Sequence, residues 1–191
     1  MSNRILMLIL AALSLIAVMV AGIWRQSPAP AFTPRPVLDA MVGISPPRPL
    51  PALASVDAQG VRLAFNARIT RPTVISFWAT WCPPCLRELP SFGPFKAQAA
   101  AAGIDVLTVS EDKGGAALPV ALLAEKELSF LPLVIDADGA LAEALGVRGM
   151  PTTLIVDGKG EEIARMEGEA DWSRTSSLDA VIRLLGNAAS P

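Results

Sequence analysis

The chain contains only two cysteines, and both lie in the segment Trp81-Cys82-Pro83-Pro84-Cys85. Cysteines three residues apart at the start of a helix can form a disulfide, which needs Cα atoms roughly 4.4–6.8 Å apart. The N-terminus of a helix also favours the thiolate form of a cysteine placed there. The spacing therefore favours a redox dithiol in which Cys82 is the nucleophile. Cys85 would be the resolving thiol, which attacks a mixed disulfide on Cys82.

Other uses of a cysteine pair fit this sequence less well. A structural zinc site needs four ligands, and the chain has neither a third cysteine nor any histidine. A disulfide that closes so short a loop stabilises a fold only slightly. The lack of histidine also removes the usual general base and any Cys-His catalytic pair. We therefore expect no metal and no separate cofactor, with the Cys82–Cys85 pair itself as the redox group.

Glu88 follows Cys85 by three residues. On a continuous helix its carboxylate would lie on the same side as the inner sulfur. Partial burial would raise the pKa of this carboxyl group and allow it to accept the proton of the Cys85 thiol. A solvated glutamate that interacts only with the helix dipole is the alternative.

The elements that must hold these residues alternate along the chain. We expect strands at 61–65, 73–78, 104–109, 131–135, 152–156 and 162–166, the last two joined by a hairpin at 157–160. We expect helices at 82–102, bent by Pro90 and Pro94, at 118–127 and at 140–145, with a closing amphipathic helix around 178–185. This order predicts an α/β fold with a central mixed sheet and helices on both faces.

The N-terminal quarter of the sequence differs from the rest. Residues 5–24 are uncharged and almost wholly apolar, long enough as a helix to cross the ~30 Å core of a bilayer. A cleaved signal peptide is the alternative, with 29–31 (Ala-Pro-Ala) as a candidate cleavage site. We expect a membrane anchor or uncleaved signal at 1–25, a proline-rich extended linker at 26–50 and one folded domain at 51–191.

Two separated motifs resemble the thioredoxin superfamily. They are Phe-Trp-Ala-Thr-Trp-Cys-Pro-Pro-Cys at 77–85 and Gly-Val-Arg-Gly-Met-Pro-Thr-Thr at 146–153. The sequence is most similar to the membrane-anchored TlpA-like branch, which includes the ResA and CcmG (DsbE) reductases of cytochrome c biogenesis. The likeness runs from about Pro51 to Leu185 and implies a thioredoxin-like fold. It also implies a thiol-disulfide oxidoreductase in the periplasm, held by a single-pass anchor in the bacterial inner membrane.

The resemblance assigns roles around the dithiol. In that family the proline matching Pro151 is cis and packs beside the cysteines, and the residue before it, here Met150, offers its backbone to an extended substrate. By itself, Pro151 would be an ordinary proline at the start of a strand. The resemblance also makes Glu88 the proton acceptor, since Ser76 stands where thioredoxins have an aspartate.

The residue types of the remaining neighbours of the dithiol indicate their roles. We expect Trp81 to offer an apolar docking surface, together with Pro83 and Pro84. Trp78 is expected in the core. Four further residues are placed outside the site: Arg87 as a solvated helix residue, Glu111 and Asp112 as surface acids, and Trp172 packed at the entry to the last helix.

The resemblance implies that the chain reduces disulfides of client proteins, such as apocytochrome c or a copper-site protein, and is re-reduced by an upstream membrane thiol-disulfide donor. An oxidant or isomerase of the same fold is an alternative, because the direction depends on the reduction potential. A peroxidase would need Pro and Thr where Ile75 and Ala79 stand. A non-catalytic metal carrier belongs to another class, but related copper carriers use a wider cysteine spacing and a histidine. The slightly acidic chain has no basic block that would bind nucleic acid.

Overall fold

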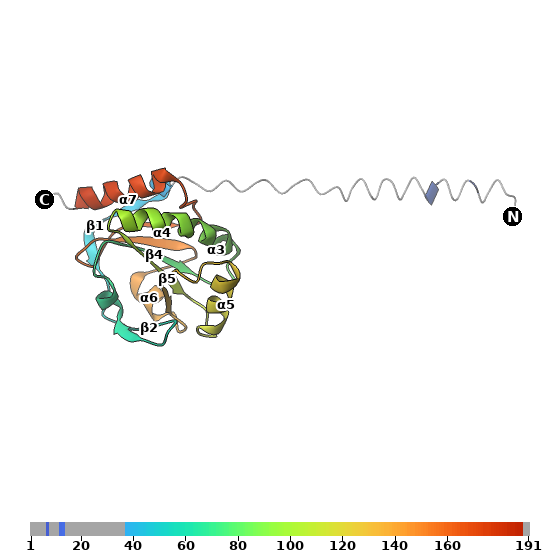
Figure 1. Ribbon diagram of the computed structural model, residues 1–191, viewed down its shortest axis with the longest axis horizontal. Coiled ribbons are helices and arrows are strands. Elements are labelled where there is room, and N and C mark those ends of the chain that lie inside the picture. The colour runs from blue at the N-terminus through green and yellow to red at the C-terminus, as the bar shows by residue number, and fades with distance from the viewer. Residues whose placement is uncertain (1–6, 8–11, 14–36, 189–191) are drawn as a thin grey trace. The chain divides into compact units, whose positions relative to one another are not determined.

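The computed structural model describes residues 7, 12–13 and 37–188. Within these residues, eight strands form one sheet in the order β1-β8-β7-β4-β5-β6-β2-β3 (Figure 1). The strands are β1 (Val42–Pro49), β2 (Ala54–Asp57), β3 (Arg62–Ala64), β4 (Thr73–Trp78), β5 (Asp105–Ser110), β6 (Leu133–Ile135), β7 (Thr152–Val156) and β8 (Glu161–Glu167). Strands β4, β5 and β6 are parallel to one another, whereas β7 runs antiparallel to both of its neighbours, β4 and β8. The expected mixed sheet is confirmed.

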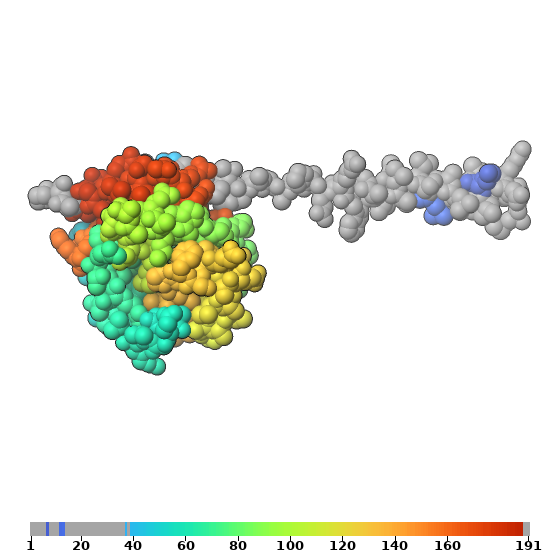
Figure 2. All heavy atoms as spheres, in the orientation of Figure 1, coloured from blue at the N-terminus to red at the C-terminus, as the bar shows by residue number. Residues whose placement is uncertain are grey.

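Helices cover both faces of this sheet. They are α2 (Val37–Ala40), α3 (Pro83–Glu88), α4 (Phe92–Ala101), α5 (Ala117–Glu125), α6 (Ala140–Leu145) and α7 (Thr175–Ala188), with short 3₁₀ turns η1 (Phe65–Arg68) and η2 (Leu89–Ser91). Buried side chains of α3, α4, α5 and α7 share one core, and those of η1 and α6 belong to the other. Figure 2 shows α7 (red) and α4 (green) lying against each other at the surface of the molecule, outside the first of these cores.

The alternation of side chains along β4 explains why the sheet has a core on each face. Val74 and Trp78 belong to the first core, and Ile75 and Phe77 to the second. Since successive side chains of a strand point to opposite faces, a strand buried on both sides is mostly apolar, and β4 has only Thr73 and Ser76 as polar residues. All six residues of β4 are buried, which places the strand before the dithiol at the centre of the domain.

The expected linker at 26–50 is wrong for its second half. Residues Val42–Pro49 form β1, which pairs antiparallel with β8, and α2 lies just before it. The prolines are tolerated because β1 is an edge strand, where a missing N–H breaks no inner ladder. The register also shifts between Gly43 and Arg48. The folded unit therefore begins before residue 51.

The apolar run at 5–24 and the linker residues 26–36 lie outside the described residues, apart from residues 7 and 12–13. Among the described residues, none of the helices combines the length and the apolar character that a bilayer crossing needs.

The long helix expected at 82–102 is divided. Helix α3 ends at Glu88, η2 spans Leu89–Ser91, and α4 begins at Phe92. Pro90 lacks the N–H that would continue the α-helical ladder, so the chain tightens into a 3₁₀ turn there. The predicted interruption is confirmed at Pro90, whereas Pro94 lies in the first turn of α4 and does not break it. The interruption separates the helix that carries the dithiol from the one that packs on the sheet.

Candidate active site

The dithiol lies just beyond the carboxyl end of β4. Cys82 is the N-cap residue of α3, and the pair is closed as a disulfide with its Cα atoms 5.3 Å apart. The Cys82 sulfur accepts the backbone N–H of Cys85 across 3.3 Å. Since Pro83 and Pro84 have no N–H, Cys85 is the first backbone donor that the helix can offer. The expected position of Cys82 at the head of a helix is confirmed.

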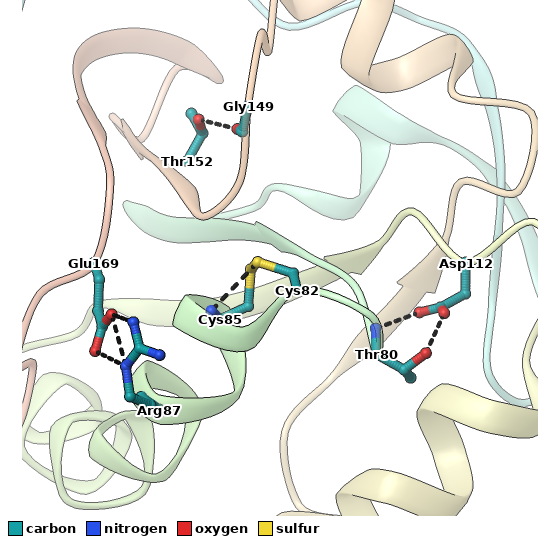
Figure 3. The surroundings of a disulfide bond; sticks show 8 residues. All are labelled: Thr80, Cys82, Cys85, Arg87, Asp112, Gly149, Thr152 and Glu169. Carbon is teal, nitrogen blue, oxygen red and sulfur yellow. Dashed lines mark hydrogen bonds and ion pairs between the residues drawn. A yellow bond between two sulfur atoms is a disulfide. The ribbon is translucent and has the colours of Figure 1, made fainter. Parts of the chain in front are cut away.

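The turn that presents Cys82 is fixed by Asp112. Its carboxylate accepts the backbone N–H of Thr80 at 3.0 Å and the Thr80 hydroxyl at 2.5 Å, as Figure 3 shows. The Ser110 hydroxyl donates to the same carboxylate at 2.8 Å. Asp112, which the sequence placed among the surface acids, is 3 % exposed and holds the turn between β4 and the dithiol against the end of β5.

A groove of about 410 Å³ opens beside the dithiol. It is lined by Trp81, Cys82, Pro83, Pro84, Glu111, Ala142, Val147, Arg148, Gly149 and Met150. Four of the five residues expected to bind substrate therefore lie on its wall. The fifth, Pro151, is buried behind Met150, and the peptide bond between these two residues is cis. The hydroxyl of Thr152 donates to the Gly149 carbonyl at 2.7 Å, which closes the turn across from the disulfide in Figure 3.

The two sulfurs differ in their surroundings. Both cysteines are buried in the core that contains Leu89 and Trp172, but Cys82, 5 % exposed, also lines the groove, whereas Cys85, 1 % exposed, does not. Trp81 is 64 % exposed and forms an apolar rim next to Cys82. This arrangement lets an incoming disulfide reach Cys82 while Cys85 stays shielded.

Glu88 is buried rather than solvated. Its side chain is on the helix of Cys85, three residues further on, and the residue is 2 % exposed. Its Oε1 accepts the indole N–H of Trp172 at 2.5 Å. Burial raises the pKa of Glu88 to about 8; the hydrogen bonds from Trp172 and from the Ala170 backbone lower it, and the nearby charge of Glu169 raises it. The carboxyl group can therefore hold or release a proton near neutral pH.

Glu111 belongs to the groove, although the sequence placed it outside the site. Burial raises its pKa to about 8, and the nearby carboxylate of Asp136 raises it further. The backbone N–H of Glu111 donates to the Trp78 carbonyl at 2.9 Å, which brings the end of β5 next to the end of β4. The sequence did contain a signal for this position, because Glu111 follows the strand expected at 104–109, which lies parallel to β4. The carboxyl ends of neighbouring parallel strands lie at the same edge of a sheet, where α/β proteins bind their ligands.

Two further residues make contacts that the sequence did not predict. Arg87 is not simply solvated, since its guanidinium pairs with Glu169 at 2.6 Å, facing it in Figure 3. Trp172 does pack before the last helix, but its N–H also reaches Glu88. Local sequence spacing could not predict this contact, because the two residues are 84 positions apart. Trp78 is buried, as expected.

Comparison with known proteins gives matches that cover most of the chain. The Redoxin family model matches residues 25–182. The chain is 33 % identical over 131 residues to the thiol:disulfide interchange protein DsbE homolog of Paracoccus denitrificans, covering 68 % of each chain. It is 30 % identical over 163 residues to DsbE of Pseudomonas aeruginosa, covering 84 % of this chain and 82 % of that one. Thiol-disulfide oxidoreductase ResA of Bacillus thuringiensis is 25 % identical over 119 residues, covering 62 % of this chain and 68 % of that one.

Solved structures resemble the fold at lower identity. A secreted thiol-disulfide isomerase from Corynebacterium glutamicum has a TM-score of 0.65 at 18 % identity, covering 83 % of this chain and 95 % of that one. A thiol:disulfide interchange protein of the thioredoxin family from Chlorobium tepidum has a TM-score of 0.59 at 19 % identity, covering 74 % and 98 %. These likenesses confirm the thioredoxin-like fold.

Proposed function

Because the chain belongs to the redoxin family, we propose that this thiol-disulfide oxidoreductase acts as a reductase of disulfides in client proteins outside the cytoplasm. The observation that carries the proposal is the position of the dithiol. The Cys82 sulfur lines the groove at the head of α3, and the cis Met150–Pro151 turn forms the facing wall.

The reaction begins with the reduced pair. The Cys82 thiolate attacks one sulfur of the client disulfide, and the other client sulfur leaves as a thiolate. Cys85 then gives up its proton and attacks the Cys82 sulfur. The mixed disulfide breaks, the second client sulfur leaves, and the Cys82–Cys85 bond closes. Two electrons have passed from the protein to the client, and the closed pair awaits a thiol donor.

Glu88 is the proton acceptor for the second step. A base works best when its pKa lies near the working pH, and burial raises the pKa of Glu88 to about 8. Its place three residues after Cys85 on α3 puts the two side chains on one face of the helix. When an upstream donor reopens the disulfide, the same group returns a proton to Cys85.

The groove wall would hold the client as an extended chain. Met150 would offer its backbone beside Pro151, and Trp81, Pro83 and Pro84 would contact apolar side chains next to the client cysteines. The redox group is the cysteine pair itself, with no added cofactor. Among the described residues, no group of three or more acidic or cysteine side chains is arranged to hold a metal ion.

The likeness to the ResA and DsbE proteins supports a proposal for the client and the location. The client would be apocytochrome c or a copper-site protein, and the electron donor a membrane thiol-disulfide protein. The catalytic domain would lie in the periplasm, tethered to the bacterial inner membrane by the apolar segment at 5–24.

Reduction potential distinguishes a reductase from an oxidant or isomerase of the same fold. A value for the Cys82–Cys85 couple near that of thioredoxin, about −270 mV, would support reduction. A value near about −120 mV, as in a strong oxidant, would contradict it.

Clients can be captured on the Cys85→Ser variant, which lacks the resolving thiol and should keep them as mixed disulfides on Cys82. The matched control is Cys82→Ser, in which the buried Cys85 alone should capture none. Adducts that a reducing agent releases from the first variant only are the expected result. Equal capture by both variants would count against the assigned roles.

A further inference from the structure

Trp172 lies in the loop between β8 and α7 and is fully buried. Its ring stacks on Phe92 with centroids 5.1 Å apart and an interplanar angle of 21°, and it meets Phe95 edge-on at 5.1 Å and 64°. These two rings fix the plane of the indole and therefore the direction of its N–H. The N–H points at the Glu88 carboxyl group and donates to Oε1 at 2.5 Å.

The backbone of Trp172 is tied to the same helical segment. Its N–H donates to the Ser91 hydroxyl at 3.0 Å, and that hydroxyl donates to the Glu88 carbonyl at 2.7 Å. Trp172 thus contacts Glu88 directly through its ring and indirectly through Ser91.

We propose that Trp172 is a positioning residue, which holds the Glu88 carboxyl group by its indole N–H and sets the pH range in which Cys85 attacks the mixed disulfide. The inference rests on the proposed function, in which Glu88 accepts the Cys85 proton.

The charges around Glu88 define the direction of the effect. On the loop side, Glu169 raises the pKa of Glu88, and Arg87 of α3 pairs with Glu169. On the helix side stand Cys85 and, beyond it, Cys82. The Trp172 N–H stabilises the carboxylate and so lowers the pKa that burial has raised. Without this donor, Glu88 would hold its proton to higher pH and accept the Cys85 proton less readily.

The test separates the two sulfur steps. The reduced full-length chain, in detergent, is mixed with excess dithiobis(nitrobenzoate), an aromatic disulfide. The first nitrobenzoate thiolate is released when Cys82 attacks, at a rate that depends on reagent concentration. The second is released when Cys85 closes the internal disulfide, at a rate that does not. The pH profile of this second rate is the readout.

Trp172→Phe keeps most of the aromatic packing but has no N–H. In Trp172→Phe, the rising part of the pH profile of the second rate, called here the limb, should move to higher pH by about one unit. This shift corresponds to about 1.4 kcal/mol, roughly the free energy of a hydrogen bond to a charged group. The first rate should be unchanged. Glu88→Gln should remove the limb, and Trp172→Phe added to Glu88→Gln should have no further effect on it.

Trp78→Phe is the matched control. Trp78 is also buried, but its indole N–H has no hydrogen-bond partner among the described residues. This variant should lose stability through the smaller ring and leave the limb in place. A limb that moves as far in Trp78→Phe as in Trp172→Phe would overturn the proposal.

The wild-type protein gives a second test that does not depend on the folding of any variant. With ¹⁵N-labelled tryptophan, the indole N–H resonance of Trp172 should titrate with the midpoint of the second-rate limb, while that of Trp78 stays constant. A Trp172 resonance that is constant over this range would overturn the proposal. If Glu88→Gln removes the limb but Trp172→Phe does not move it, only the role of Trp172 fails. If Glu88→Gln leaves the limb in place, the proton-acceptor role of Glu88 itself fails.

Discussion

Gly168 donates its backbone N–H to the carbonyl oxygen of Pro151 across 2.8 Å. The loop that begins at Gly168 continues through Ala170 to Trp172, and both of these residues hydrogen-bond to Glu88. One loop therefore contacts the cis-proline turn at the groove and the buried carboxyl group beneath the dithiol. The same loop therefore supports both the surface that would bind the client and the carboxyl group that would accept the proton.

Glu169, in the same loop, gives a prediction of opposite sign to that for Trp172. Its negative charge raises the pKa of Glu88. Glu169→Gln removes this charge, and the loss of a nearby negative charge favours the Glu88 carboxylate. The pH limb of the Cys85 step should therefore move to lower pH. An upward movement in the same two-phase assay would contradict the assigned electrostatics.

Stability should fall as pH rises through the neutral range. The pKa of Glu88 is about 8 in the folded protein against an ordinary value of 4.5, so between these values the folded state keeps a proton that the unfolded state has lost. Fewer protons bound in the unfolded state make the free energy of unfolding decrease with pH, by at most about 1.4 kcal/mol per unit for one group.

Glu88→Gln should flatten this slope in urea titrations of the disulfide form. Glu111, whose pKa is also raised to about 8, supplies a second part of the slope that Glu111→Gln should remove. A slope unaltered by Glu88→Gln would show that the carboxyl group is already ionised in the folded protein at neutral pH.

The wall of the groove depends on a buried ion cluster. Glu162 is fully buried and pairs with Arg48 of β1 and Arg165 of β8, and both guanidinium groups donate to the Leu145 carbonyl at the end of α6. Glu162→Gln should cost about 3 kcal/mol of unfolding free energy, because two cations lose their buried partner. Arg48→Ala should cost less than about 1 kcal/mol, since that side chain is 42 % exposed and screened by solvent.

Urea unfolding of these two variants would check the difference. Equal losses would mean that β1, and not the buried carboxylate, is the dominant element of the cluster. This strand was missed by the sequence analysis, so its contribution is worth measuring separately.

Trp81 gives a prediction for client binding. Its ring is 64 % exposed at the rim of the groove, where an extended client would cover it. Trp81→Ala should lower kcat/KM roughly tenfold for a protein disulfide, the effect of losing about 1.4 kcal/mol of apolar contact. The rate with a small aromatic disulfide should change little. A loss of equal size for both substrates would point to an effect on Cys82 itself.

Sequence patterns located the centre of the fold better than its edge. The bounds of β4, β7 and α6 are those expected, because each is a short apolar segment ended by a clear turn residue or by the dithiol motif. β1 was missed, because prolines in its sequence favour an extended linker and only pairing with β8 makes it a strand. Local pattern does not reveal a partner at the edge of a sheet.

The sequence likewise predicted one part of the site better than the other. Cys82, Cys85 and the groove residues beside them are contiguous motifs, and the structure brings them together as expected. The burial of Glu88 depends on Trp172, far along the chain, and the place of Glu111 depends on the pairing of β5 with β4. Such contacts arise from tertiary packing, which spacing alone does not report.

The most direct test of the account is intact-mass analysis of two purified variants after reaction with a peptide disulfide. Cys85→Ser should carry one half of the peptide on Cys82 as a stable mixed disulfide, because that residue lines the groove and the second step is blocked. Cys82→Ser should carry little or none, because Cys85 is 1 % exposed. An adduct on Cys85 and none on Cys82 would contradict the central claim.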